Sequence, residues 1–480
     1  MNLWKHTALA KPAALALAIA AAYPGLASAQ SNEELLKELR ALKDRVGELE
    51  KKLADKPAAG VAGAAGTAGT AQWGMTPEQV QDFNRISVKT EGLEDAVEAQ
   101  GLKNLKISGY FDPTYIYNRA QNRAGFQFLN PVANDGYNYD NSYFGTASID
   151  FQKEMEGGAK WRLTLMPNRG AGSIADSSSY SIVHEASVSI PLGDLQTRLI
   201  AGQIPDWSGY EYIQATTTKL VTRGLLLDFT EPTAYTAAGM EVISGKWDVK
   251  AVLGNYNQTK QSANRKSPVL AYRVDYSKGE FNGFGFAGVH GKAANFSANV
   301  LDGDSNPVAQ ADSRLDLFEV DAYFTRGDLT LQGQIGFGRQ KAASITPGAD
   351  GSLRDSQWWG VSALAAYKFI PRWEAVARFD YIDNHKNGGG LLQYSVADGR
   401  NGIGPDGNLG CSPINIVDGC DKGANRYALA VGVNYLLTPN TTIKTEYRFD
   451  AATQPVFLDT RDGSYRKNNQ LLGASVVVSF

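Results

Sequence analysis

Charged side chains at every second position are the residues of this sequence best placed to act on another molecule. Between residues 443 and 450 every even position is charged and the odd positions are mostly apolar, so a β-strand would carry its charges on one face. Around a water-filled passage such charges select solutes, whereas the alternative is a cross-strand network of ion pairs that only stiffens the wall. The candidate wall positions are Arg273, Asp275, Glu319, Asp321, Arg378, Asp380, Lys444, Glu446 and Arg448, with Asp150, Arg162 and Glu185 among others assigned to the same face.

The charges of these candidate positions nearly cancel, as do those of the whole chain. The sequence has 47 Lys and Arg against 50 Asp and Glu, for a formal net charge of -3. Removing the first 29 residues, which contain two lysines and no acids, leaves about -5. A protein of this balance lacks the positive field that nucleic-acid binding needs. The pattern favours neither anions nor cations.

A second group of polar residues lies in the long connection from Pro205 to Thr233. This connection carries four acidic residues against two basic ones. It could fold into the interior of a barrel, or it could lie outside and pack at the axis of an oligomer. The candidates for a narrow opening are Asp206, Tyr210, Glu211, Lys219, Arg223 and Asp228.

Signals of catalysis and of metal binding are weak. After residue 29 the histidines are His184, His290 and His385, on separate segments without the spacing of a zinc site. No G-x-S-x-G elbow, P-loop or H-E-x-x-H motif occurs, although a serine–histidine triad assembled in space would leave no such signature. The Asp/Gly/Asn-rich stretch 398–421 could bind calcium, and a hydrated loop is the simpler interpretation. We expect no enzyme, no cofactor and no resident metal.

The two cysteines, Cys411 and Cys420, lie in that same stretch. Because the periplasm oxidises thiols, we expect a disulfide that closes a surface loop. A metal site or a reactive thiol is the alternative.

β-Strands are the elements that must position these residues. From about residue 104 the helical period disappears, and alternating segments of about ten residues follow, as in membrane barrels. Tight turns, such as 156–158 and 244–245, interleave with long connections, and aromatic residues near the strand ends fit interfacial girdles. The sequence predicts an all-β, transmembrane, antiparallel up-and-down barrel over residues 104–480. Its roughly sixteen strands begin near residues 105, 142, 160, 181, 195, 233, 246, 268, 283, 314, 328, 357, 372, 425, 441 and 468.

Both ends of the chain predict export to a membrane. Residues 1–29 predict a signal peptide, because they contain two lysines, an apolar run and the cleavage site Ala27-Ser28-Ala29. No later segment offers the roughly 18 uncharged apolar residues of a membrane helix, so only a closed barrel could satisfy the backbone in a bilayer. The last strand ends at Phe480, which resembles the signal read by the barrel-assembly machinery of Gram-negative bacteria. We expect an outer-membrane location, with lipid and lipopolysaccharide as neighbours.

Residues 30–55 predict a periplasmic coiled coil. Their apolar residues alternate spacings of four and three, which is a heptad seam. A trimer is favoured over a dimer, and a lone solvated helix is the alternative. The core positions are Leu35, Leu39, Leu42, Val46, Leu49 and Leu53.

A linker and a second helix are expected between this coiled coil and the barrel. Residues 56–75 are rich in Pro, Gly, Ala and Thr, as in flexible linkers. Over 76–103, Thr76, Pro77 and Gln79 form the start signals of a helix. This helix could pack beneath the barrel or act as a plug.

The connection from Pro205 to Thr233 also carries a family resemblance. Gly209-x-Glu211, Thr222-Arg223 and Pro232, followed by Thr236 and Gly239, are similar to a pattern in OmpL-like β-barrel porins. The departures are Thr222 in place of Ser and the displacement of a Gly by Ala237-Ala238. The N-terminal organisation also resembles DcaP-type and phosphate-selective porins. The resemblance implies a third loop that folds into the lumen as the constriction, and a homotrimer.

These features together predict a water-filled porin that passes small hydrophilic solutes or ions by diffusion. One alternative is a structural protein whose coiled coil tethers the outer membrane to the cell wall. Another is an adhesin or receptor that displays the loop around Cys411 and Cys420.

Overall fold

The computed structural model describes residues 76–128, 145–166, 182–232, 234–256, 268–279, 281–294, 312–344, 354–384, 404–411 and 417–480. The predicted signal peptide, the heptad seam and the linker, residues 1–75, lie outside the described residues. So do His385 and, within the stretch proposed for calcium, residues 398–403 and 412–416.

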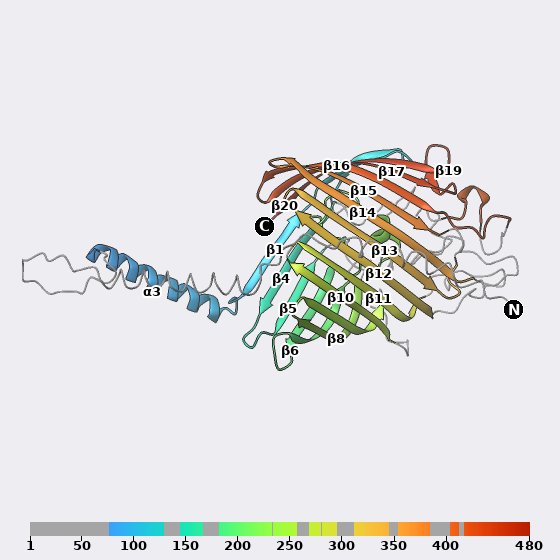
Figure 1. The fold of residues 1–480 in the computed structure, drawn as a ribbon. Helices are drawn as coiled ribbons and strands as arrows, with labels where there is room; N and C mark the ends of the chain where they lie inside the picture. The colour runs from blue at the N-terminus through green and yellow to red at the C-terminus, as the bar shows by residue number, and fades with distance from the viewer. Residues whose placement is uncertain are drawn as a thin grey trace, which may run out of the picture. The chain divides into compact units, whose positions relative to one another are not determined.

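The described strands close into a sixteen-strand antiparallel barrel, which confirms the predicted fold (Figure 1). Two wall strands are built from two pieces each: β1 (Leu105–Phe111) continues as β2 (Thr114–Asn118), and β3 (Arg123–Gln127) continues as β4 (Ala147–Glu154). The barrel closes where the last strand pairs with β1 and β2. The other wall strands are β5 (Lys160–Leu165), β6 (Val183–Pro191), β7 (Thr197–Pro205), β8 (Ala234–Ser244), β9 (Trp247–Tyr256), β10 (Val269–Gly279), β11 (Asn282–Ala294), β12 (Asp312–Arg326), β13 (Leu329–Gln340), β14 (Ser356–Ile370), β15 (Trp373–Asp383), β16 (Arg426–Thr438), β17 (Thr441–Ala452) and β20 (Asn468–Ser479).

From β5 onward the predicted strand starts lie within about two residues of the observed ones. The second strand is the exception, because its start near residue 142 was wrong. The described pieces of this wall strand are Arg123–Gln127 and Ala147–Glu154, and residues 129–144 between them lie outside the described residues. A piece of five residues is too short to establish an alternating pattern, so this part of the sequence reads as a loop.

Tight hairpins join the strands at the end of the barrel where β1 begins and β20 finishes. In two of them the turn is Gly245-Lys246 and Gly327-Asp328. Gly245 and Gly327 have φ of 61° and 58°, which two-residue hairpins require and which glycine adopts without strain. The tight turn predicted at 244–245 is therefore confirmed.

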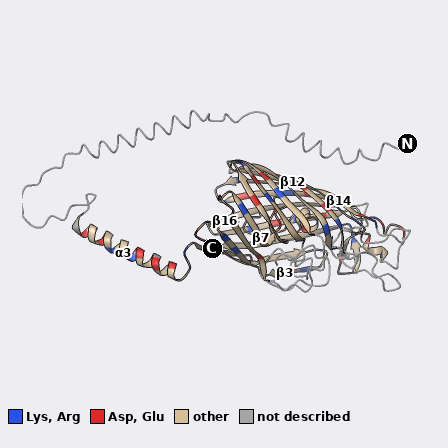
Figure 2. Ribbon diagram, turned by 90° about the horizontal axis from the view of Figure 1, so that it is seen from below, with Lys and Arg blue, Asp and Glu red and all other residues tan. Residues whose placement is uncertain are grey.

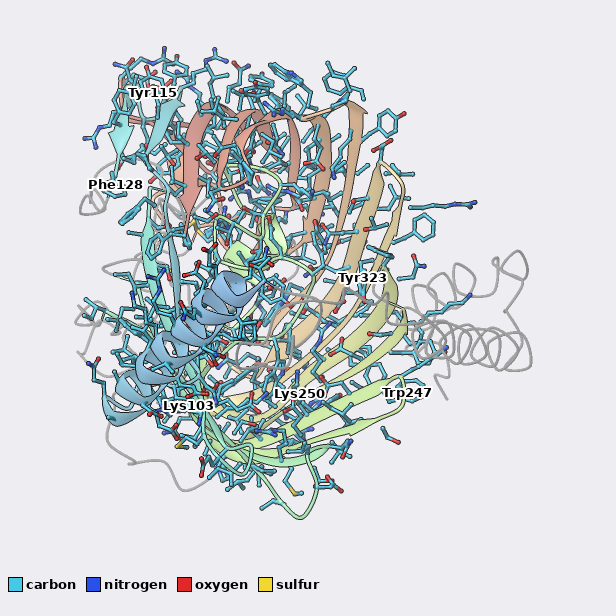
Figure 3. The ribbon with its side chains drawn as sticks, turned by 90° about the vertical axis from the view of Figure 1, so that its left-hand side faces the viewer. Lys103, Tyr115, Phe128, Trp247, Lys250 and Tyr323 are labelled. Carbon is cyan, nitrogen blue, oxygen red and sulfur yellow. A yellow bond between two sulfur atoms is a disulfide. The ribbon has the colours of Figure 1, made fainter. Side chains whose placement is uncertain are left out.

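The wall has an apolar outer face and a polar inner face. In β15 and β16 the outward side chains of Phe379 and Leu429 are exposed, whereas the inward Arg378 and Asp380 are buried. Aromatic pairs lie at both ends of the outer face. The ring centroids of Trp373 and Tyr435 are 4.6 Å apart near the tight turns, and those of Trp359 and Tyr381 are 5.2 Å apart near the other end. Figure 3 shows Lys250 and Tyr323 on the inner side of the strands.

The helix α3 (Pro77–Ala99) precedes β1. Its predicted start is confirmed, because the Gln79 amide donates to Thr76 Oγ1 and the Thr76 amide donates to Gln79 Oε1. The helix ends at Ala99, and Gly101 takes a left-handed φ of 69°. None of the helices in the described part of the chain has both the length and the apolar character needed to cross a membrane.

Candidate functional site in the barrel lumen

The connection between β7 and β8 runs through the barrel interior. We call its described residues, 206–232, the inner loop. Side chains from well-separated strands bond to it: Arg273 of β10 donates to Trp207 O (2.6 Å), and Gln334 of β13 accepts from the Tyr210 amide (3.2 Å). Arg448 of β17 donates to Arg223 O (2.5 Å). Since all three side chains project inward, the loop must lie inside the wall.

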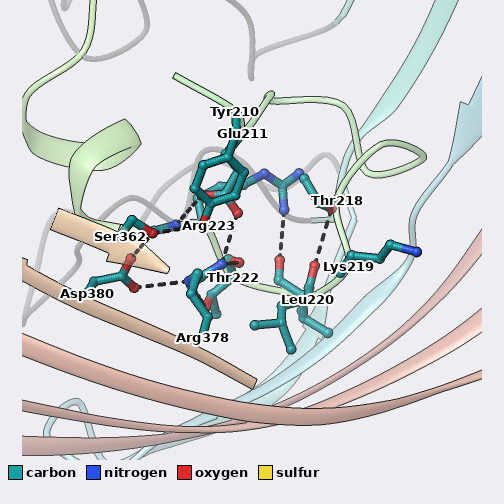
Figure 4. Close-up of polar contacts among 12 residues, drawn as sticks. Tyr210, Glu211, Thr218, Lys219, Leu220, Thr222, Arg223, Ser362, Arg378 and Asp380 are labelled. Atoms are coloured by element: carbon teal, nitrogen blue, oxygen red, sulfur yellow. Dashed lines mark hydrogen bonds and ion pairs between the residues drawn. The ribbon is translucent and has the colours of Figure 1, made fainter. Parts of the chain in front are cut away.

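One anchor of the inner loop is the pair Arg378–Glu211 (Figure 4). Arg378 Nη1 lies 2.9 Å from Glu211 Oε1 and also donates to Thr222 O at 3.0 Å. The second carboxylate oxygen of Glu211 accepts from the Gly224 amide at 2.6 Å. Burial raises the pKa of Glu211, and Arg378 opposes that shift. Asp380 Oδ2 accepts from Arg378 Nε at 3.0 Å, so the guanidinium is satisfied on both sides.

A second anchor joins Thr222 to β17. The Thr222 amide and hydroxyl both donate to the Glu446 carboxylate, at 2.7 and 2.5 Å. Arg448 Nη1 donates to the same hydroxyl at 3.0 Å and is itself paired with Asp450. These contacts explain why threonine serves at this position, because its hydroxyl can donate to a carboxylate and accept from a guanidinium.

A third anchor lies nearer the tight-turn end of the wall. Lys444 Nζ donates to the carbonyl oxygens of Ala215 and Thr218, both at 2.6 Å. Lys219 Nζ lies 2.8 Å from Glu374 Oε1. An ammonium group with carbonyl acceptors at this distance holds the loop backbone rather than a solute.

Arg223 stabilises the inner loop internally. Its guanidinium donates to Tyr212 O (3.1 Å), to Val221 O (3.0 Å) and to Ile213 O, so it links the two arms of the loop. The side chain is buried. The sequence predicts Arg223 as a candidate for a narrow opening; the structure gives it contacts within the loop itself.

The remaining loop candidates are also enclosed. Asp206 accepts from the hydroxyls of Tyr235 (2.5 Å) and Ser208 (2.9 Å), and burial raises the pKa of Asp206 to about 6. The Tyr210 hydroxyl lies 2.7 Å from Ser362 Oγ. Asp228 is buried in the short helix α4 (Leu225–Phe229). The role of these residues as a constriction stays a prediction.

Apolar contacts hold α4 against the same side of the wall. Leu225, Leu226 and Phe229 belong to one cluster with inward side chains such as Trp358 of β14 and Ile382 of β15. The guanidinium of Arg426 lies over the Phe229 ring at 4.8 Å and over the Phe457 ring at 4.9 Å. This apolar contact was not predicted from the sequence. The run Leu225-Leu226-Leu227 inside an otherwise polar connection is the signal that could have indicated it.

The predicted wall residues on β10 and β12 face inward and form a network. Arg273 pairs with Asp321 (2.9 Å) and with Asp275 (2.7 Å). Figure 2 shows acidic and basic residues interspersed along the strands. The near cancellation of lumen charge therefore has a structural origin in short-range pairs.

The end of the inner loop meets β12 and β13 through two acids and one amide. Gln334 Nε2 donates to Glu231 Oε1 at 2.5 Å and to Glu319 Oε1 at 3.0 Å. Burial and the neighbouring Glu319 raise the pKa of Glu231 well above its ordinary value. Gly209 makes room for this contact, because a Cβ there would lie 2.6 Å from Gln334 Oε1.

Opposite the anchored side, the inner loop leaves a chamber of about 600 Å³. On its wall lie Asp150 of β4, Arg162 of β5, and His184 and Glu185 of β6. The loop contributes Tyr212, Gln214, Thr216 and Thr217 to the facing side, and Gln214 Nε2 lies 3.3 Å from His184 Nε2. The inward assignment of Asp150, Arg162 and Glu185 holds, whereas the polar loop residues were missed because uncharged side chains carry no comparable pattern.

Outside the lumen, Cys411 and Cys420 form a disulfide in the connection between β15 and β16. Across the described ranges, no group of three or more His, Cys, Asp or Glu side chains has an arrangement that could hold a metal ion.

A family model described as "Protein of unknown function (DUF3138)" matches residues 10–480. No curated protein matches the sequence.

Several solved outer-membrane barrels are similar in structure. An anion-selective porin from Comamonas acidovorans is 11% identical over 78% of this chain and 99% of that chain, with a TM-score of 0.48. The outer membrane channel DcaP of Acinetobacter baumannii is 11% identical over 78% of this chain and 97% of its own, with a TM-score of 0.48. OmpT, an outer membrane protein of Vibrio cholerae, is 10% identical over 78% of this chain and 97% of its own, with a TM-score of 0.47.

Proposed function

We propose, from the premise that this chain belongs to the family described as "Protein of unknown function (DUF3138)", that it is an outer-membrane channel for the diffusion of small hydrophilic solutes. The observation that carries the proposal is the division of the wall. Apolar and aromatic side chains cover the outside, while ion pairs, hydroxyls and a chamber of about 600 Å³ lie inside. A water-soluble barrel would carry the opposite arrangement.

The outer face supports residence in a bilayer. Exposed apolar side chains run along strand after strand, and an apolar surface of that extent is unstable in water. Aromatic pairs at both ends of the strands fit the two interfaces of a membrane. Closure of the sheet leaves no unpaired strand edge in lipid.

The inner loop divides the lumen in the proposed channel. Its anchors on β13, β15 and β17 place it against one side, so solutes would pass along the opposite side, between the loop and strands β4 to β6. The six candidates at residues 206–228 then shape the opening by holding the loop. The side chains that would contact the solute are those of the chamber.

The lumen also favours a channel over the two alternatives. A barrel that served only as an anchor for a tether, or as a platform for an adhesive loop, would have no use for an interior loop with three separate polar anchors. The heptad seam from Leu35 to Leu53 is included in the proposal as a clamp for a homotrimer, and Phe480 as the assembly signal.

Conductance in planar lipid bilayers tests this function. Folded protein, recognised by the heat-dependent shift of its electrophoretic mobility, should give steady ionic channels, in steps of three if the barrels are trimeric. Folded protein that inserts into the bilayer without conducting would reject the channel. A chain lacking residues 31–56 is the matched variant for the clamp, and it should conduct in single steps.

A further inference from the structure

Arg162 of β5 differs from Arg378 and Arg448 in the hydrogen bonds that its guanidinium group forms. Its Nε lies 2.9 Å from Asp150 Oδ1 and 3.4 Å from Glu185 Oε2. Among the residues that the structure describes, neither of its Nη atoms has a hydrogen-bond partner. The Arg162 side chain is 43% exposed, whereas those of Asp150 and Glu185 are 9% and 10% exposed. The guanidinium therefore offers its two outer nitrogens to the chamber.

The carboxylates on either side of Arg162 are held in fixed positions. Asp150 accepts from Thr164 Oγ1 (2.7 Å) and from Gln152 Nε2 (2.5 Å). Glu185 accepts from Ser187 Oγ (2.6 Å). Because each carboxylate can accept about four hydrogen bonds, acceptor positions remain beside the free donors of Arg162. The wall thus presents acceptors and donors side by side.

The most exposed side chains that the inner loop presents to the chamber are polar and uncharged. Tyr212 is 45% exposed, Thr216 and Thr217 are also exposed, and Gln214 lies between them. The charged loop residues that border the chamber already accept hydrogen bonds from other protein groups, because Glu211 accepts from Arg378 and Asp206 accepts from the Tyr235 hydroxyl. Together the two sides provide hydroxyls, an amide, an aromatic ring and one guanidinium flanked by two carboxylates.

This composition fits one class of solute better than charged ones. Asp150 and Glu185 outnumber the one guanidinium, and Asp206 on the loop side adds negative charge, so the chamber disfavours anions. An organic cation would have to lie beside Arg162, whose free nitrogens can only donate. A vicinal diol both donates and accepts at neighbouring oxygens, so it can use the carboxylates and the guanidinium together. The rings of such a solute also have apolar faces that can pack on Tyr212.

We propose that the chamber is a binding site for neutral polyhydroxylated solutes of the sugar class, with Arg162 as its main donor. This inference rests on the proposed channel function and specifies its substrate class. Binding would be weak and reversible, because a channel must also release its solute.

Block of the ionic current by sugars tests the site. Three probes of nearly equal size differ in charge: glucose is neutral, gluconate carries a carboxylate and glucosamine carries an ammonium group. The wild-type current in potassium chloride should fall with glucose, and more with a linear trisaccharide of glucose, and should fall least with gluconate. Stronger block by gluconate or by glucosamine than by glucose would overturn the substrate class.

Two variants separate the site from a general narrowing of the pore. Arg162→Gln removes the free guanidinium donors and should weaken glucose block about tenfold or more, as expected for the loss of hydrogen bonds from a charged group. Tyr212→Ala, on the facing side, should weaken it by a smaller factor. Arg339→Gln is the control, because Arg339 lies exposed at the far end of β13, and block should be unchanged.

The outcomes distinguish the two proposals. Correct folding of each variant is checked by its heat-dependent mobility. If Arg162→Gln folds and glucose still blocks with wild-type strength, the site is wrong although the channel stands. If wild-type protein inserts and carries no current, the channel itself fails, and equilibrium dialysis of labelled trisaccharide against folded protein then decides whether the chamber still binds the sugar.

Discussion

The two sides of the lumen use the same residue types to opposite effect. On the side of β15 and β17, Arg378 and Arg448 are fully buried, and each donates to both a wall carboxylate and the inner loop. On the side of β5, Arg162 has two carboxylate neighbours and keeps its outer nitrogens free. The first arrangement fixes a loop, and the second faces a chamber. Whether an inward charged residue holds the inner loop or can contact a solute therefore depends on whether the inner loop covers it.

Disrupting the anchored side should have the largest effect. Arg378→Met leaves Glu211 buried without its cation, which costs about 3 to 5 kcal/mol when one partner of a buried pair is removed. We expect the inner loop to detach, so that conductance rises and the current becomes noisy, and amides of residues 206–232 exchange faster with deuterium.

The double variant Arg378→Met with Glu211→Gln tests whether charge is the cause. Because both charges are then removed, part of the loop's protection should return. Wild-type exchange and conductance in the single variant would contradict the assignment of Arg378 as an anchor. If the double variant is no better protected than the single one, the anchor depends on packing rather than on charge.

The contact at the end of the inner loop should respond to pH. The pKa of Glu231 is raised in the docked loop, so the docked state binds protons more tightly than a released loop with an ordinary carboxyl pKa of 4.5. Docking is then strongest below that ordinary value and weakens as pH rises through the raised pKa. The buried Glu319, Asp206 and Glu211 raise the pKa of Glu231 further, and the hydrogen bond from Gln334 opposes them.

Conductance and deuterium exchange between pH 5 and pH 9 measure this linkage. Exchange in the peptide that contains Glu231, corrected for the intrinsic rate, should increase with pH in the wild type. Glu231→Gln should make it nearly constant, because the titrating group is gone. A wild-type profile that stays flat, or that falls as pH rises, would show that this contact carries no proton linkage.

Disrupting the chamber side should alter selectivity with little effect on the loop. Arg162→Gln leaves Asp150 and Glu185 without their counter-charge, and it should shift the reversal potential in a salt gradient toward cations. Deuterium exchange of the inner loop should stay close to wild type. An equal shift from the exposed control Arg339→Gln would remove the special role of the chamber wall.

The sequence predicted the barrel far better than it predicted the division of the lumen. Alternation placed Arg378 and Arg162 on the same face, because the period of a strand reports orientation and nothing about what lies opposite. Which of them is covered depends on the path of the inner loop, and that path follows long-range contacts such as Thr222 with Glu446, 224 positions away in the chain. The prediction for Arg223 shows the same limit, since its partners are carbonyl groups of its own loop. Every residue has a backbone carbonyl group, so residue types do not indicate which of these groups will accept a hydrogen bond.

The smallest effect should come from the connection between β15 and β16 that holds Cys411 and Cys420. Their disulfide closes a segment with a sequence separation of 9, for which the chain-entropy model gives a contribution of about 2 to 3 kcal/mol to the order of that segment. Neither cysteine is among the residues that line the chamber. Cys411→Ser with Cys420→Ser should therefore leave the heat-dependent mobility, the conductance and the glucose block unchanged, and should increase proteolysis only between β15 and β16. A changed conductance would mean that this connection reaches the current path, and the division of the lumen into an anchored side and a chamber side would then have to include it.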